Sequence, residues 1–295
     1  MIDRSVPPAG VVVGVDGDPT TLRAVGWAAQ EADHRGLPLD LVQVLPPSHR
    51  PSEELYTPTG RALSLLDQAR RIATGAAPDL VVRLSVVDGV AGPALVTASR
   101  RAHLLVLGAR DLAGSLELTL GRTLVHAMGH AACPVVVVPA HWGPEDRHIG
   151  PVLAGVDGSP ESHGAVAFAA DVADRWRARV TAIGVLPRGV TDAEDEARRR
   201  VLAEARAGLT ARHLGVRIHE AVRHGTPSGE ILAVARDRAA LVVLGSRGRG
   251  ALVGPLIGST SQAVVRAAPC PVAVLSSTAA ARWTSPERVW AEEGV

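Results

Sequence analysis

The chain repeats itself, and this repeat constrains its fold more than any other feature. The segment Val11–Pro19, VVVGVDGDP, returns as Val152–Pro160, VLAGVDGSP, and the equivalent glycines lie 141 residues apart (155 − 14). Further along, Cys133-Pro134 returns as Cys270-Pro271, 137 residues apart (270 − 133). Repetition over most of a 295-residue chain predicts two copies of one domain, each long enough to bury a core of its own.

Each copy alternates short aliphatic runs with longer amphipathic stretches. This pattern is typical of βαβ units built around a parallel sheet that is covered on both faces. In the second copy we expect strands near 151–156, 179–185, 216–222, 240–245 and 271–275, with helices between them. The predicted fold is α/β: two tandem, five-stranded, doubly wound domains with parallel sheets, Rossmann-like in type.

The helix starts in the second copy have recognisable capping residues. Ser159 precedes a proline, Thr191 is followed by Glu194 in the spacing of a capping box, and Thr226 also precedes a proline. We expect all three side chains to cap their helices.

The repeat and the composition around it suggest where the domains begin and end. Residues 10–140 form the first predicted domain and 151–276 the second, and 141–150 reads as a linker rich in Gly, Pro and acidic residues. Residues 1–9 and 277–295 fit neither copy and are treated as tails. Trp283 and Trp290 in the second tail either dock on a domain or stay exposed, and the sequence leaves both open.

Charge and composition exclude several classes of function. All 31 basic side chains are arginines, so a Walker-type P-loop, a Schiff-base enzyme and a pyridoxal-phosphate enzyme are excluded, because each needs an amine. The 30 acidic side chains nearly balance them, which predicts no nucleic-acid partner and no membrane partner. Without an apolar run of roughly 20 residues or a signal-peptide core, we expect a cytoplasmic protein. Cys133 and Cys270 each precede an aliphatic run and are predicted to be buried, inert thiols.

A glycine-rich loop in the second copy has the chemistry of an anion site. It follows the apolar run 240–244 and carries Gly245 and Gly248, whose missing side chains let a ligand approach the backbone N–H groups. Gly258, Ser259 and Thr260 then open a helix, whose first N–H groups lack partners and whose dipole favours negative charge. Ser259 and Ser261 add hydroxyl groups. A phosphate chain is the expected ligand.

The spacing Gly245-x2-Gly248-x9-Gly258-Ser259 resembles the ATP-binding signature of the universal stress protein family, G-x2-G-x9-G-[ST]. The resemblance covers nearly the whole chain except the two tails. It implies a regulatory stress-response protein that binds ATP, with Mg²⁺ carried by the nucleotide, and it leaves AMP or another adenine nucleotide open. The residues that it implies for ATP binding are Asp157, Gly158, Val185, Gly245, Gly248, Gly258, Ser259, Thr260 and Ser261.

The resemblance also implies where two of these residues, Asp157 and Val185, would lie relative to ATP. Asp157 would lie near the ribose and phosphates, and an Asp-Gly turn that closes onto its own backbone is the alternative interpretation of this residue. Val185, at the end of the second strand, would meet the adenine through its backbone. Arg247 and Arg249 are expected to be solvated, because the family does not depend on arginine there.

The family also associates through its last strand, which predicts that 135–138 meets 272–275 within one chain. A homodimer and an unknown regulatory protein partner both stay open.

The first copy departs from the signature. Its loop reads Gly108-Ala109-Arg110-Asp111 and continues after nine residues as Gly121-Arg122-Thr123-Leu124, so an aspartate replaces the second glycine. The carboxylate would repel a phosphate by roughly 4 kcal/mol at about 4 Å. We therefore expect a weak or empty ATP site at the equivalent residues, which are Asp16, Val44, Gly108, Asp111, Gly121, Arg122 and Thr123.

Two rival functions remain open. A slow ATP hydrolase is one, although no positioned base or arginine finger is evident. A scaffold that needs no nucleotide is the other. His126 and His130 have a zinc-compatible spacing, but nothing completes a ligand set, so surface histidines and no protein-held metal are expected.

Overall fold

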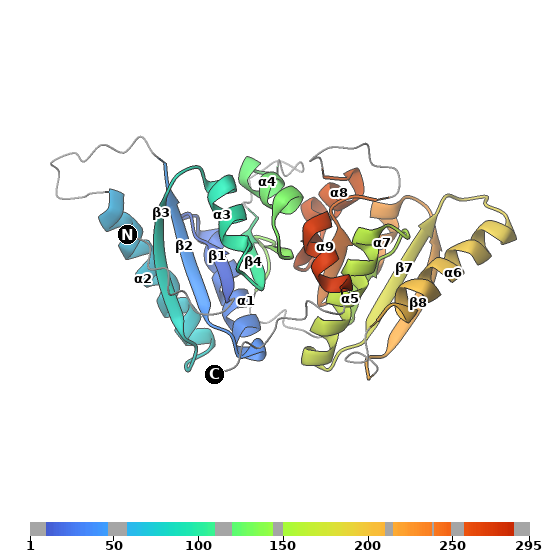
Figure 1. Cartoon of the computed structure of the whole chain (residues 1–295), viewed down its shortest axis with the longest axis horizontal. Helices are drawn as coiled ribbons and strands as arrows, with labels where there is room; N and C mark the ends of the chain where they lie inside the picture. Colours follow the sequence, from blue (N-terminus) through green and yellow to red (C-terminus); the bar gives the residue numbers. More distant parts are fainter. Residues whose placement is uncertain are drawn as a thin grey trace.

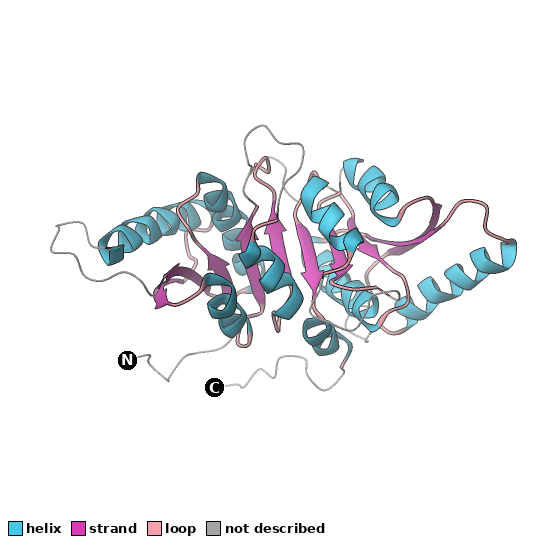
Figure 2. Ribbon diagram, turned by 90° about the horizontal axis from the view of Figure 1, so that it is seen from above, coloured by secondary structure: helices cyan, strands magenta, loops and turns pink. Residues whose placement is uncertain are grey.

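The computed structural model describes residues 10–46, 58–109, 120–143, 150–209, 215–237, 239–248 and 257–285. Two α/β halves stand side by side, and the described strands run between layers of helices (Figures 1 and 2). The elements of the first half are β1 (Val11–Gly14), α1 (Pro19–Arg35), β2 (Leu39–Leu45), α2 (Pro58–Ala76), β3 (Val82–Asp88), α3 (Ala91–Ser99), β4 (Leu104–Gly108), α4 (Arg122–His130) and β5 (Val135–Val138).

The second half repeats this order and adds one helix. Its elements are β6 (Val152–Gly155), α5 (Pro160–Trp176), β7 (Val180–Leu186), α6 (Asp192–Ala207), β8 (Ile218–His224), α7 (Pro227–Arg236), β9 (Leu241–Gly245), α8 (Ser259–Ala267), β10 (Val272–Leu275) and α9 (Ser277–Thr284). The predicted α/β fold is confirmed. Four of the five predicted strands match closely, and the third lies about two residues further along than predicted.

The two halves share one ten-stranded sheet in the order β3-β2-β1-β4-β5-β10-β9-β6-β7-β8. Every pairing inside a half is parallel, whereas β5 and β10 pair antiparallel, with Val136 opposite Ala273. The predicted contact between the two last strands is therefore confirmed. Because these central strands are buried on both faces, their sequences are continuous runs of Val, Leu and Ala.

The predicted capping residues cap their helices in two of the three cases. The Ser159 hydroxyl accepts a hydrogen bond from the Ser162 N–H, and Thr191 and Glu194 form the complete capping box. Thr226 occupies the cap position of α7, but its side chain makes no capping hydrogen bond, so that prediction was wrong in its detail.

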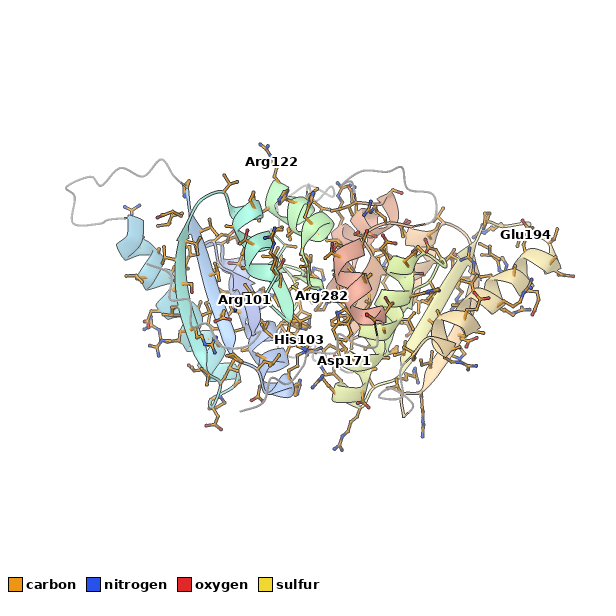
Figure 3. All side chains as sticks on the ribbon, in the orientation of Figure 1. Arg101, His103, Arg122, Asp171, Glu194 and Arg282 are labelled. Atoms are coloured by element: carbon orange, nitrogen blue, oxygen red, sulfur yellow. The ribbon has the colours of Figure 1, made fainter. Side chains whose placement is uncertain are left out.

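Helix α9 docks on the second half and reaches across to the first. It packs along α5, where Gly164 leaves room, because a Cβ there would lie 2.6 Å from the Cα of Ala280. The Trp283 ring meets Phe168 edge-on at 5.0 Å and stacks on His103 of the first half at 6.0 Å. Arg282 donates to the carbonyls of Arg100 and Ala132 (Figure 3). Trp283 therefore docks, while Trp290 lies outside the described residues.

A buried charge cluster also joins the halves. The Arg35 guanidinium of α1 donates to Glu31 at 2.6 Å and to Asp171 of α5 at 2.8 Å. Burial disfavours the charge of Arg35, but the two carboxylates raise its pKa above the ordinary value. His103 and Asp171 meet where the halves join, as Figure 3 shows. Burial first, and then the charge of Arg35, lower the pKa of His103 to about 3, so its ring is neutral here.

The two cysteines and the apolar character of the helices can also be compared with the sequence predictions. Cys133 and Cys270 are buried free thiols, and burial raises the pKa of each to about 12, as expected of inert side chains. Within the described ranges, no helix combines the length and the apolar character that crossing a membrane requires.

Candidate functional site

The candidate site lies where β6 and β9 end side by side in the second half. These parallel strands are paired, and the chain leaves them in opposite directions, which places a crevice beyond their carboxyl ends. A cavity of about 440 Å³ fills this crevice. Most of the predicted ATP-binding residues line it, namely Asp157, Val185, Gly245, Gly248, Gly258, Ser259, Thr260 and Ser261.

Gly158 is the predicted residue that does not line the cavity. Its backbone has a φ of +86°, a conformation that favours glycine, and its N–H donates to the Ser162 hydroxyl at 3.2 Å. Gly158 therefore shapes the turn between β6 and α5.

Asp157 forms the turn that the sequence allowed and also lines the cavity. Its Oδ1 accepts hydrogen bonds from the Ser159 N–H at 2.9 Å and the Ser159 hydroxyl at 2.6 Å, which is the expected turn geometry. Its Oδ2 lies against Gly248, so closely that a Cβ on Gly248 would collide with it. Only glycine fits at position 248 while the carboxylate keeps this place.

The start of α8 lines the same cavity as Asp157. Gly258 has extended backbone (φ −61°, ψ 147°), and the helix begins at Ser259. The Gln262 N–H donates to the Gly258 carbonyl at 3.1 Å and closes the first turn of the helix. The N–H groups of residues 259–261 precede that bond, so they and the helix dipole present positive charge to the cavity.

The serine hydroxyls of α8 differ in what they offer. Ser261 is buried and its hydroxyl donates to the Gly245 carbonyl at 2.7 Å, so it ties the strand end to the helix and is not a free donor for a ligand. Ser259 is exposed and Thr260 half-buried, both at the cavity wall. The expectation that Ser261 adds a hydroxyl donor was therefore wrong, although its place in the lining was correct.

Several lining residues were not predicted. Ile183, Ile231 and Leu244 form an apolar wall, and the other unpredicted lining residues include Gly155, Val156, Ser162 and Pro227. Apolar residues at strand ends are the sequence signal that could have found Ile183 and Leu244, but Ile231 is brought in by the packing of α7.

The prediction that Arg247 is solvated was also wrong. This arginine lines the cavity, and its guanidinium donates to the hydroxyl of Ser277, the first residue of α9. Ser277 in turn donates to Glu161 at 2.7 Å. The arginine that we expected to be solvated thus connects the glycine-rich loop to the helix that bridges the halves. Arg249 lies outside the described residues.

The first half has an equivalent cavity of about 510 Å³. Its lining includes the predicted residues Asp16, Val44, Gly108, Gly121, Arg122 and Thr123. Leu124 stands where Ser261 stands in the second half (261 − 124 = 137), which makes this cavity more apolar. Arg122 begins α4 and is exposed, pointing away from the body of the molecule in Figure 3. Asp111, on which the predicted repulsion depends, lies outside the described residues.

In the described part of the chain, no group of three or more His, Cys, Asp or Glu side chains could hold a metal ion. The His126 and His130 rings stack at 4.5 Å, and the Nδ1 of His130 contacts the His126 carbonyl.

Fold and site together place the protein among the doubly wound α/β proteins that have a crevice at the switch point of the sheet. Each half is a doubly wound α/β domain, and the second presents a glycine-rich loop and a helix N-terminus at the switch point of its sheet, the usual place for a phosphate-bearing ligand in such folds.

Comparison with known proteins identifies the family. The model of the universal stress protein family matches residues 10–139 and again 148–276. A universal stress protein of Mycolicibacterium smegmatis is 32% identical over 292 residues, covering 92% of this chain and 98% of the relative. One from Mycobacterium tuberculosis is 33% identical over 285 residues, covering 90% and 95%. The chain belongs to the universal stress protein family.

A solved structure supports the fold at low sequence identity. The crystal structure of a universal stress protein from Archaeoglobus fulgidus superposes with a TM-score of 0.74 at 20% identity, covering 91% of this chain and 98% of that one.

Proposed function

We propose that this universal stress protein is a nucleotide-dependent regulator that binds ATP, accompanied by Mg²⁺, chiefly in its second half. The observation that carries the proposal is the cavity that Asp157, Gly248 and the N-terminus of α8 line together. In this proposal the N–H groups of residues 259 and 260 hold the phosphates, and the apolar wall with Val185 holds the adenine. Mg²⁺ would be carried by the nucleotide.

The first half would bind ATP weakly or not at all. Arg122 stands where Ser259 stands in the second half (259 − 122 = 137), which removes an exposed hydroxyl at the helix start, and the aspartate at 111 adds negative charge to the loop. Under this proposal, calorimetry finds one tight ATP site per chain. Two equally tight sites with both glycine loops involved would contradict it.

A regulatory role needs a way for the bound state to be sensed. The hydrogen bonds from Arg247 to Ser277, and from Arg282 to the first half, connect the proposed phosphate loop to the join between the halves. Nucleotide contacts that draw Arg247 away from Ser277 would change how α9 is held, and a ligand that favours one arrangement shifts the population toward it. The proposed compartment is the cytoplasm, where ATP is abundant and thiols stay reduced.

A slow ATP hydrolase is the second candidate. Asp157 is the carboxylate among the described lining residues of the cavity, and its Oδ1 is already bonded to Ser159. A poorly placed base favours binding over turnover. A steady-state rate above about one event per second would favour the enzyme.

Gly258 offers the sharpest test. A Cβ on Gly258 would meet the Ser246 carbonyl at 3.5 Å, an ordinary contact, and its backbone suits any residue, so Gly258→Ala should fold normally. We expect at least a tenfold weaker Kd for Mg·ATP, because the methyl group obstructs the approach to the helix N-terminus. Gly121→Ala, the equivalent change in the first half, is the matched control and should leave the tight site intact. Unchanged affinity in Gly258→Ala would refute the proposed site.

A further inference from the structure

A larger cavity lies at the other end of the second half, away from the glycine-rich loop. It has a volume of about 630 Å³ and sits at the amino ends of β6, β7 and β8, beside the C-terminus of α5. Arg177, Arg179 and Arg217 line it together with Trp176. Nothing in the proposed ATP site uses this cavity.

The first half shows what the same positions look like without such a cluster. Arg177 follows α5 as Gly36 follows α1 (177 − 36 = 141), and both have left-handed backbone, with φ of 52° and 62°. The hydrogen bonds that close the two helix ends also correspond. The Ala178 N–H donates to the Ala173 carbonyl at 2.8 Å, and the Leu37 N–H donates to the Ala32 carbonyl at 2.9 Å. Glycine is the residue that this cap favours. Arginine therefore stands in a disfavoured conformation at a position where the first half uses glycine.

The other two arginines also replace uncharged residues. The Arg179 carbonyl accepts from the Val152 N–H as the Pro38 carbonyl accepts from the N–H of Val11, both at 2.9 Å. The Arg217 carbonyl likewise accepts from the N–H that opens β7, as the Val81 carbonyl accepts from the N–H that opens β2. Gly36, Pro38 and Val81 thus correspond to three arginines, so the positive charge is a property of this half and not of the fold.

The arginines are placed to meet an anion. All three are exposed, and within the described ranges none of them forms an ion pair. Asp174 is the single carboxylate among the lining residues described. A concave site with an excess of positive charge concentrates anions, and guanidinium groups bind phosphate oxygens in a bidentate manner. Arg177 is also the one non-glycine residue in the described part of the chain with positive φ, and such outliers cluster at functional sites.

We propose that this cavity is a second anion site, which binds a small polyphosphate group through Arg177, Arg179 and Arg217. The expected ligand carries a chain of two or three phosphates, either as free polyphosphate or as a phosphate ester. The volume is in the range of small-molecule sites.

Calorimetry with sodium tripolyphosphate tests the site independently of ATP. The titration uses the full chain carrying Gly258→Ala, so that a failure of the ATP proposal and a failure of this one give different results. We expect one remaining site. Adding R177G and R217V, which install the residues of the first half, should weaken its Kd at least tenfold, because each charge-assisted bond lost costs about that much.

The matched control removes two other exposed arginines of the second half, R188G and R200V, and should keep the Kd within a few-fold. R177G alone should leave the Tm unchanged or raise it, which shows that the fold survives. Equal affinities in the cavity variant and the control variant, or no site in the Gly258→Ala chain, would overturn the proposal. A parallel titration with ATP identifies the source: tighter binding than tripolyphosphate points to an ester, and equal binding to the phosphates alone.

Discussion

Replacing Arg35 with methionine should destabilise the protein more than any surface charge change. The Arg35 side chain is fully buried between Glu31, also fully buried, and Asp171, which is 14% exposed. Methionine fills similar space but leaves two buried carboxylates without their shared partner. Breaking a buried ion pair in this way costs about 3–5 kcal/mol, a large share of the roughly 5–15 kcal/mol by which domains are stable.

Arg175 provides the matched control for this change. It approaches the same Asp171 carboxylate at 3.3 Å from the solvent side, and its own side chain is 35% exposed. Because solvent screens such a pair, R175M should cost less than about 1 kcal/mol. The triple variant E31Q/R35M/D171N removes the unpaired charges and should recover part of the loss in R35M.

Urea unfolding followed by tryptophan fluorescence measures these differences. The Trp27 and Trp176 rings meet edge-on at 6.4 Å close to the cluster, so the signal reports on this region. R35M should move the unfolding midpoint far below that of R175M. Equal midpoints in R35M and R175M would refute the reasoning that the buried cluster holds the halves together.

Two further predictions concern pH and helix capping. The pKa of His103 is lowered to about 3 in the folded state, so the unfolded state binds more protons between pH 6.5 and 3, and stability falls as the pH drops through this window. The loss should be about 3 kcal/mol from pH 6.5 to 4, and H103Q should show a flatter curve in pH-dependent urea unfolding; parallel curves would contradict this. Ser159→Ala removes a capping acceptor and should lower stability by about 1 kcal/mol, whereas Thr226→Ala, whose side chain caps nothing, should cost less in thermal unfolding; equal losses would count against the capping assignment.

The repeat made the fold predictable from the sequence. Aliphatic runs such as 241–244 can only be central strands in an α/β protein, and two copies with five such runs each predict the sheet of each half. The pairing of β5 with β10 followed from the family resemblance and is confirmed.

Helix α9 could not be predicted in the same way. Ser277–Thr284 has no counterpart in the first copy, and its partner Gly164 lies more than a hundred residues earlier in the chain. The contact depends on close approach of two helix backbones, which leaves only a missing side chain as its mark in the sequence.

The candidate site was predictable where backbone chemistry defines it and not where packing does. Glycine spacing located Gly245, Gly248 and Gly258, all of which line the cavity. The anchoring of Arg247 by Ser277 depends on α9 and so stayed hidden. No sequence pattern marks Arg35 as buried, because the join between α1 and α5 buries it with both of its partners.

A crystal structure of the protein with Mg·ATP would test the central claim most directly. We predict nucleotide in the second half, with phosphate oxygens about 2.7–3.2 Å from the backbone nitrogens of Ser259 and Thr260 and no Mg·ATP of comparable occupancy beside Gly121. A vacant crevice between Asp157 and α8, with nucleotide bound in the first half instead, would contradict it.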